Sequence, residues 1–297
     1  MSIRYWNRRQ QEWGEEKVFG DAFVRAAYET PTGRFLTDKL LVRKTFSQIY
    51  GFLQNTRWSA SKIPEFCHKF QIPLEQFEPG PFATFNDFFI RRFRAGQRNF
   101  PQESTLMGAP AEARYFGFSE LLETTTLPVK GLKLLPKDIL SLPHVAELFQ
   151  GGPCLLARLC PVDYHRFHFP DSGEIQSAWR ESGKLHSVNP VALAARPQLF
   201  WENERQISIL ETEHFGKLAY VEVGALCVGK IVQSNDNDAR SNFRRGEEKG
   251  YFLFGASTVI IFGERGRWHP AKDVLENTAK GFETLVELGS AIAEAIH

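Results

Sequence analysis

Apolar residues recur at helical spacing through the first third of the chain. They fall close to one helix face over residues 17–30, and the pattern continues over 34–54. Pro31-Thr32-Gly33 separates the two segments, because proline and glycine interrupt a helix. The aromatic stretch 82–100 predicts a shorter helix, capped near Thr84 or Asn86. We therefore expect helices over roughly residues 1–100.

The pattern changes after residue 105. Short apolar runs alternate with glycine, proline and asparagine turns, which predicts a mainly β region over residues 106–265. Its most strand-like run is Val259–Phe262, which follows Gly255-Ala256-Ser257-Thr258. We expect Ser257 to open a buried core strand. The tail over residues 277–297 is predicted to be helical by its periodicity, although it contains Gly281 and Gly289.

Basic residues interleave with apolar ones in the second helical segment. The basic residues are Arg34, Lys39, Arg43 and Lys44, and the apolar residues are Phe35, Leu36, Leu40, Leu41 and Phe46. One interpretation is a helix that packs on the core and keeps a solvated basic face. The other is an interfacial helix on anionic lipid headgroups. The pattern alone does not decide between them.

Composition and charge exclude several classes of protein. The 297 residues carry a formal net charge of +1, so no bulk field favours nucleic acid. No run approaches the roughly 18 consecutive apolar residues of a membrane span, and the N-terminus lacks the apolar segment of a secretory signal. The cysteines, at positions 67, 154, 160 and 227, form no C-x-x-C pair, so we expect reduced thiols. The sequence predicts a soluble or peripheral protein.

Polar side chains are densest between Pro161 and Glu174. His165 and His168 lie three residues apart in a segment that prolines and aromatic residues predict to be extended. A straight strand places them on opposite faces, so both line one cavity only if the chain bends there. Three alternatives stay open: two ordinary histidines, a metal site that includes Cys154 or Cys160, and a serine hydrolase. The hydrolase lacks the G-x-S-x-G elbow around its serine.

Six motifs occur in an order that resembles one known family. They are "FNDFFIRRF", "DYHRFHFP", "GKLHSVNP", "LFWENER", "FGKLAYVEVGALCVGKI" and "GEEKGYFLFGASTVIIF". Together they closely resemble phosphatidylserine decarboxylase proenzymes over the whole chain, more weakly in its N-terminal part. The resemblance implies an α+β fold, with an N-terminal helical, membrane-associating region over 1–105 and a mainly β, sandwich- or barrel-like catalytic core over 106–297.

The resemblance also implies a chemistry for Ser257. Family members cleave themselves before this serine, which becomes an N-terminal pyruvoyl group. Here the cut would fall between Ala256 and Ser257 and give a β-chain of residues 1–256 and an α-chain of 257–297. The pyruvoyl carbonyl would form a Schiff base with phosphatidylserine and accept electrons as CO2 leaves, giving phosphatidylethanolamine.

Roles for the two histidines and a set of partners follow from the same resemblance. His168 would activate Ser257 as general base, oriented by Glu112, and His165 would serve the decarboxylation by delivering a proton. The partners would be phosphatidylserine, the cytoplasmic side of the cell membrane and the protein's own two chains. A homodimer stays open, and neither a metal nor nucleic acid is expected.

The chain departs from the family pattern at three positions. Glu112 and Ala113 stand where the family has aspartate and glycine, and Ala256 stands where it has glycine. The longer glutamate shifts its carboxylate by one bond, and a displacement of about 1 Å can cost roughly a hundredfold in rate. Two hypotheses follow: an active, self-cleaving phosphatidylserine decarboxylase, or an unprocessed pseudoenzyme that keeps a phospholipid-binding cleft.

Overall fold

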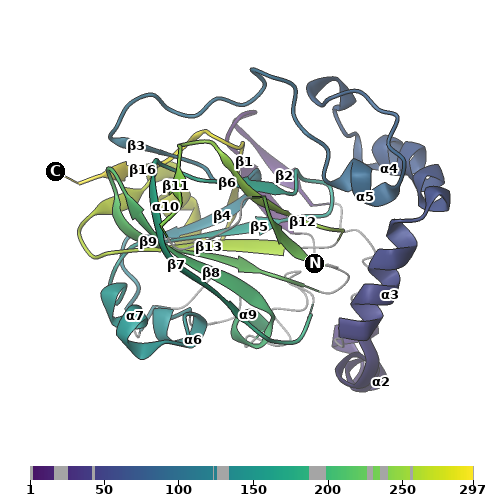
Figure 1. Cartoon of the computed structure of the whole chain (residues 1–297), viewed down its shortest axis with the longest axis horizontal. Helices are drawn as coiled ribbons and strands as arrows, with labels where there is room; N and C mark the ends of the chain where they lie inside the picture. Colours follow the sequence, from purple (N-terminus) through teal and green to yellow (C-terminus); the bar gives the residue numbers. More distant parts are fainter. Residues whose placement is uncertain are drawn as a thin grey trace.

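A ten-stranded sheet forms the centre of the fold in the computed structural model (Figure 1). The structure describes residues 3–16, 26–41, 44–122, 124–125, 134–186, 199–225, 230–234, 240–254 and 257–296. In spatial order the strands of this sheet are β11 (Asn242–Phe243), β7 (Gly173–Glu181), β8 (Arg205–Thr212), β9 (Gly216–Val223), β13 (Ser257–Gly263), β5 (Cys154–Leu159), β4 (Ala113–Phe118), β15 (Glu283–Val286), β1 (Arg4–Asn7) and β2 (Glu12–Glu15).

Strand β13 lies in the interior of this sheet. It pairs antiparallel with β9 on one side and with β5 on the other. All seven of its residues, Ser257–Gly263, are buried. A strand that is covered on both faces typically has a continuous run of apolar residues in its sequence, and Val259–Phe262 is such a run. The prediction that Ser257 opens a buried core strand is therefore confirmed, as is the sheet-rich character of the region after residue 105.

Two small sheets accompany the large one. Strands β10 (Ile231–Gln233), β12 (Glu248–Phe252) and β6 (Arg166–His168) form the first, and β14 (Trp268–Pro270), β16 (Ala291–Ala295) and β3 (Leu106–Gly108) form the second. Helix α10 (Lys272–Ala279) packs on β4, where Thr278 Oγ1 accepts a hydrogen bond from the Gly117 N–H at 3.0 Å. Gly117 leaves room for this approach, since a β-carbon there would lie 2.8 Å from Val274 Cγ1.

Short helices from the N-terminal region line one side of the molecule (Figure 1). They are α2 (Pro31–Leu36), the π-helix η1 (Thr37–Leu41), α3 (Lys44–Gln54), the 3-10 helix η2 (Arg57–Lys62), α4 (Ile63–Phe70), the 3-10 helix η3 (Leu74–Gln76) and α5 (Phe85–Phe89). The remaining helices are α6 (Pro136–Ile139), α7 (Pro143–Leu148) and α9 (Leu199–Glu202). None of the described helices is long and apolar enough to span a bilayer.

Local signals set two of the helix starts. Thr30 caps α2 by accepting the Gly33 N–H at 3.0 Å, just before the predicted break at Pro31. Thr84 caps α5 by accepting the Asp87 N–H at 3.1 Å, as the sequence predicts. Residues 17–25 of the first predicted helix lie outside the described residues.

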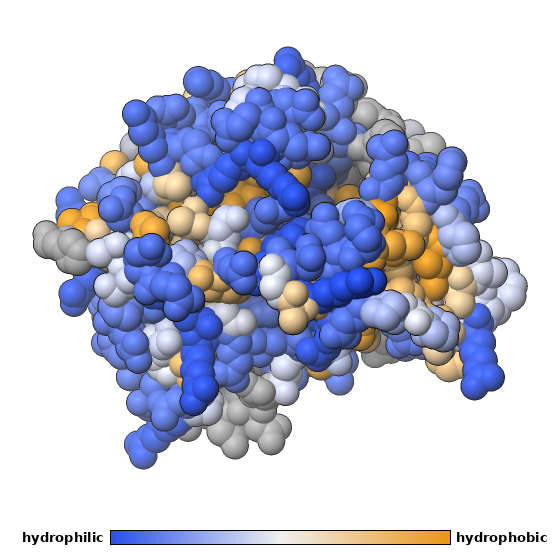
Figure 2. Space-filling view, turned by 90° about the horizontal axis from the view of Figure 1, so that it is seen from above, coloured by the Kyte–Doolittle hydropathy of each residue, from blue (hydrophilic) through white to orange (hydrophobic). Residues whose placement is uncertain are grey.

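Aromatic residues join the N-terminal helices to the core. Phe66 of α4 and three phenylalanines of α5 form a buried cluster with Phe254, which lies three positions before the start of β13. In Figure 2, hydrophobic residues gather near the right-hand edge, the side on which Figure 1 places α3 to α5. The helical segment therefore lies directly beside the start of β13.

The prediction of helix for the first residues is wrong. Residues 4–15 form a hairpin, β1 and β2, whose strand β1 pairs parallel with β15 of the large sheet. Trp6 and Trp13 face each other across the hairpin with ring centroids 5.4 Å apart. Such aromatic cross-strand pairs stabilise antiparallel strands and explain why this polar stretch is extended.

The prediction of a helical tail is also wrong for most of its length. Helix α10 ends at Ala279, and the chain continues as β15 and β16. Gly281 and Gly289 have φ values of 84° and 79°, which a helix does not accommodate. These two glycines mark turns next to the short strands β15 and β16. The spacing of apolar residues in these strands resembles that of a helix, so the sequence pattern concealed them.

A buried ionic cluster lies where the hairpin meets the sheet. Arg114 of β4 and Arg158 of β5 are paired across neighbouring strands. Glu16, directly after β2, lies 2.6 Å from Arg158 and 3.4 Å from Arg114, and Glu283 lies 2.5 Å from Arg158. Burial raises the pKa of Glu16, but the guanidinium groups of Arg158 and Arg114 outweigh it and lower the pKa to about 2.

Replacing Glu16 with glutamine is expected to destabilise the fold by about 3 kcal/mol, because two buried guanidinium groups then share one carboxylate fewer. The lowered pKa makes this stabilisation fully present above the ordinary value of 4.5 and lost as pH falls through 2. Urea unfolding of wild type and Glu16→Gln at pH 7 and pH 3 measures both effects. The exposed Glu12→Gln on the same hairpin is the matched control. Equal stability of Glu16→Gln and Glu12→Gln at pH 7 contradicts the interpretation.

Candidate functional site

Ser257 is fully buried at the first position of β13. Its partner in the neighbouring strand is Leu159, the last residue of β5. The chain leaves β5 at Cys160 and reaches His165 within five residues, so strand pairing brings the histidine segment to the serine. This is how two residues 92 positions apart in sequence come into contact.

The imidazole of His165 faces the hydroxyl of Ser257. Its Nδ1 lies 3.4 Å from Ser257 Oγ, and its Nε2 lies 2.9 Å from the Cys160 carbonyl oxygen. A carbonyl oxygen only accepts, so Nε2 carries the proton and the lone pair of Nδ1 is directed at the serine. Phe89 of α5 stacks on the ring with centroids 3.8 Å apart and fixes its plane. The pair is arranged to pass the hydroxyl proton to the imidazole.

Burial keeps His165 neutral. The side chain is fully buried, and this loss of solvation, with the positive charge of Arg91 nearby, lowers its pKa from 6.5 to about 3. Nδ1 is therefore unprotonated throughout the physiological pH range. An imidazole with this pKa is a weak base, and it is uncharged when it faces the serine hydroxyl.

His168 lies in β6 and makes a different set of contacts. Its Nδ1 donates to the Gly246 carbonyl at 2.9 Å, and its Nε2 lies 3.3 Å from the Tyr164 hydroxyl. Burial lowers its pKa. The two histidines do not meet at one serine, in keeping with an extended segment. Within the described part of the chain His168 has no hydrogen bond to Ser257, so the expected contact between them is not found.

Glu112 also lies apart from the histidines. Its carboxylate forms a two-point ion pair with Arg98, at 2.6 and 2.9 Å, and accepts the Leu288 N–H at 3.4 Å. Among the residues that the structure describes, it has no hydrogen bond to His168. A guanidinium outcompetes a neutral imidazole for a carboxylate, which explains why the predicted Glu112–His168 pair does not form. Ala113 is buried in β4, and Ala256 lies outside the described residues.

The acidic residue closest in chain position to His165 is Asp163, which the sequence interpretation overlooked. Its side chain is only 8% exposed, lies 2.6 Å from Arg114 Nη1 and accepts the Cys160 N–H at 2.7 Å. Arg91, which is buried, donates to the Val162 carbonyl at 3.1 Å. Asp163 is the first residue of the motif "DYHRFHFP", so the sequence contained a signal for it. The family pattern indicated Glu112 as the acidic residue instead.

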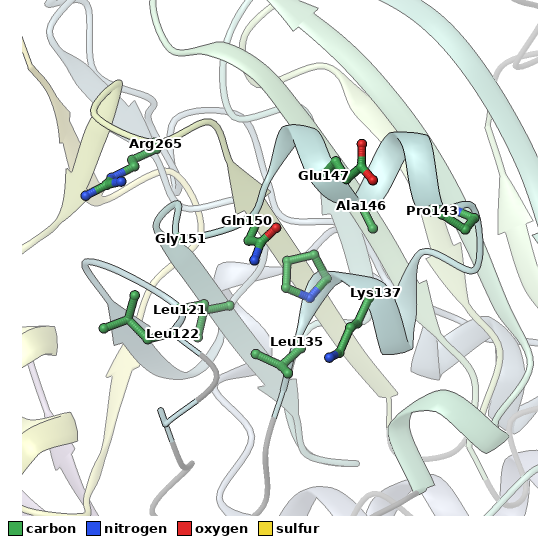
Figure 3. Close-up of a pocket in the computed structure, with 11 residues that line it drawn as sticks. Leu121, Leu122, Leu135, Lys137, Pro143, Ala146, Glu147, Gln150, Gly151 and Arg265 are labelled. Atoms are coloured by element: carbon green, nitrogen blue, oxygen red, sulfur yellow. The ribbon is translucent and has the colours of Figure 1, made fainter.

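Two pockets differ in their distance from this site. One, of about 820 Å³, is lined by residues of α6 and α7 and by Arg265 (Figure 3). Arg265 lies beyond the far end of β13, whose seven residues extend over about 20 Å, so this pocket is at the opposite end of the strand from Ser257. The other, of about 200 Å³, is lined by Phe254 and by residues of α3, α4 and α5. Of these two pockets, the smaller one is nearer the serine, because Phe254 precedes Ser257 by three residues.

No group of three or more histidine, cysteine or acidic side chains in the described ranges is arranged to hold a metal ion. Cys154 and Cys160 are both buried free thiols, and burial raises the pKa of each well above its usual value. A thiol held protonated in this way is a poor metal ligand. Cys227 lies outside the described residues.

Comparison with known proteins gives one consistent result. Residues 85–294 match the family model described as phosphatidylserine decarboxylase. A phosphatidylserine decarboxylase proenzyme of Clostridium novyi is 39% identical over 98% of this chain and 98% of its own length. Proteins of the same name from Clostridium botulinum strain Alaska E43 and Clostridium perfringens are 38% and 37% identical, over 99% and 98% of this chain and 99% of their own lengths.

The neutral state and the tautomer of His165 are directly measurable. In the Ser257→Ala chain, which cannot cleave itself, the imidazole nitrogens of His165 are expected to show one tautomer, protonated at Nε2, without titration between pH 5 and 8. Nitrogen-15 NMR of labelled histidine reports both properties. The urea-unfolded chain is the control, and its histidines are expected to titrate with a midpoint of about 6.5. A midpoint near 6.5 for His165 in the folded chain contradicts the geometry.

Proposed function

Because this chain belongs to the phosphatidylserine decarboxylase family, we propose that it cleaves itself before Ser257 and then converts phosphatidylserine to phosphatidylethanolamine with release of CO2. One observation carries the proposal: the buried Ser257 hydroxyl faces the unprotonated Nδ1 of a neutral His165. A serine hydroxyl is a poor nucleophile unless a base takes its proton, and this arrangement supplies the base.

Self-cleavage begins with the chain's own residues. As His165 Nδ1 takes the hydroxyl proton, Ser257 Oγ attacks the carbonyl carbon of residue 256. The C–O bond of an ester forms, the C–N bond to Ser257 breaks, and the proton passes to the amine that is released. Nδ1 serves as base and then as acid because the Cys160 carbonyl keeps the other ring proton on Nε2. Loss of the Ser257 α-proton then breaks the Cβ–Oγ bond, which frees residue 256 as a carboxylate and leaves a dehydroalanine at residue 257. Water adds to this residue and ammonia leaves, which gives the pyruvoyl group.

The surroundings of Ser257 fit the pyruvoyl group that would follow. Such a group supplies an electrophilic carbonyl that accepts the electron pair released when a carboxylate departs as CO2. Phe89, Phe254 and the apolar strand β13 surround the position and exclude water. An apolar setting disfavours the charged carboxylate relative to neutral CO2, which assists its departure.

The departure from the family pattern at Glu112 leaves this pair intact. Glu112 is engaged with Arg98, so its extra methylene displaces nothing at Ser257. The alternative of an unprocessed pseudoenzyme finds no support in the relatives, whose names describe them as proenzymes.

Membrane association at the cytoplasmic face belongs to the same proposal. Large apolar side chains along α2, α3 and η2 are exposed: Phe35, Leu36, Ile49, Phe52, Leu53 and Trp58. Lys62 and Lys69 line the 200 Å³ pocket that adjoins Phe254, and both favour an anionic surface. These features support docking of the helices on the lipid headgroups, so that a phospholipid reaches Ser257 without leaving the bilayer.

Replacing each histidine tests the chemistry. His165→Ala is expected to slow self-cleavage by about 100-fold or more, the usual contribution of a general base, and Ser257→Ala is expected to abolish it. His168→Ala is expected to slow it by less than about tenfold, since its ring does not reach the serine. The appearance of the short fragment over time, followed on denaturing gels, gives the rates, with the exposed His144→Ala as control. Normal cleavage in His165→Ala together with a block in His168→Ala contradicts the assignment.

Exposed apolar residues of α3 test the membrane contact. Ile49→Glu with Phe52→Glu is expected to weaken binding to phosphatidylserine-containing vesicles by about tenfold or more, because each side chain contributes roughly 1 kcal/mol or more on burial. Co-sedimentation measures the bound fraction. Leu148→Glu is the matched control, since Leu148 is 47% exposed and lies in α7 among the lining helices of the distant pocket. Equal binding by both proteins excludes α3 as the contact.

A further inference from the structure

The turn before His165 is closed by a single side chain. Asp163 Oδ2 accepts the Cys160 N–H at 2.7 Å, and the Asp163 N–H donates to the Cys160 carbonyl at 2.9 Å. Both polar groups of the Cys160 backbone are therefore held by one residue three positions later. Asp163 therefore determines how the Cys160 backbone is oriented.

The same carbonyl holds His165. Cys160 O accepts the Nε2 proton at 2.9 Å as well as the Asp163 N–H. A rotation of this carbonyl would release the proton from Nε2, and either tautomer would then be open to the ring. The direction of the Nδ1 lone pair at Ser257 thus depends on the Cys160 carbonyl, and through it on Asp163.

The Asp163 carboxylate is itself fixed. Arg114 Nη1 lies 2.6 Å from the same Oδ2 that accepts the Cys160 N–H, and the two side chains are only 5% and 8% exposed. Arg91 holds the turn from its other side through the Val162 carbonyl at 3.1 Å. Charge-assisted hydrogen bonds of this kind are shorter and about twice as strong as neutral ones. The buried ionic cluster therefore extends to the turn that holds His165.

We propose that Asp163, held by Arg114, is a positioning residue that keeps His165 in the Nε2-protonated tautomer and at its place beside Ser257. The proposal rests on the proposed function only in that His165 serves Ser257. Asp163 itself does not touch Ser257 in the part of the chain that the structure describes.

The tautomer of His165 gives a test that needs no activity. In full-length Ser257→Ala, one tautomer is expected, and in Ser257→Ala with Asp163→Ala a mixture of both, read by nitrogen-15 NMR. Asp163→Asn keeps an oxygen that accepts the Cys160 N–H, so it is expected to retain mainly the Nε2-protonated form. A single, unchanged tautomer in Asp163→Ala overturns the proposal. If Asp163→Ala does not fold, loss of the single tautomer in the milder Asp163→Glu supports the proposal, and its retention overturns it.

Cleavage kinetics then separate positioning from bulk stability. In the chain that retains Ser257, Asp163→Ala is expected to lower the self-cleavage rate by about 100-fold, and Asp163→Asn to restore at least a tenth of the wild-type rate. Glu283→Gln is the matched control, because it removes a carboxylate of the same ionic cluster that does not contact the turn. If Asp163 acted only by stabilising the fold, Asp163→Ala and Glu283→Gln would slow self-cleavage equally when they lower Tm equally. That result contradicts the proposal. Normal cleavage by His165→Ala, together with a changed His165 tautomer in the Asp163→Ala chain, refutes only the proposed function.

Discussion

The hydrogen bond from the His165 imidazole to the Cys160 carbonyl determines the chemistry of the site. It leaves one ring nitrogen unprotonated and directs that nitrogen at Ser257. Burial of the ring keeps it neutral, because a charged imidazole would lose its hydration without gaining an anionic partner. The imidazole is thus held beside the serine by a backbone carbonyl and a stacked phenylalanine, and no carboxylate among the described residues is hydrogen-bonded to the ring directly.

The fold supplies this arrangement from four distant parts of the chain. Pairing of β5 with β13 brings the turn to the serine, and α5 provides Phe89. The N-terminal hairpin contributes Glu16 to the ionic cluster of Arg114 and Arg158, to which Asp163 is joined. The helices proposed to meet the membrane share one aromatic cluster with Phe254 and with Phe89, the residue that stacks on His165.

The sequence predicted features that depend on local pattern. The strand after Ser257 follows from its β-branched and aromatic run, and the cap of α5 follows from Thr84. Ser257 and His165 were identified through the family motifs, and both lie at the site. Features that depend on distant partners were missed: the hairpin at residues 4–15 requires β15, and the two strands after Gly281 resemble a helix in periodicity. The predicted contact between Glu112 and His168 is not found among the described residues, because Glu112 pairs with Arg98 instead. No local sequence rule indicates that Arg98 binds this carboxylate.

The proposed function requires that this chain convert Ser257 to a new N-terminus by its own chemistry. The mass of the purified wild-type protein under denaturing conditions tests this most directly. Two fragments are expected, residues 1–256 and 257–297, the shorter one blocked at its N-terminus by a pyruvoyl group. A single intact chain of 33.9 kDa would contradict it.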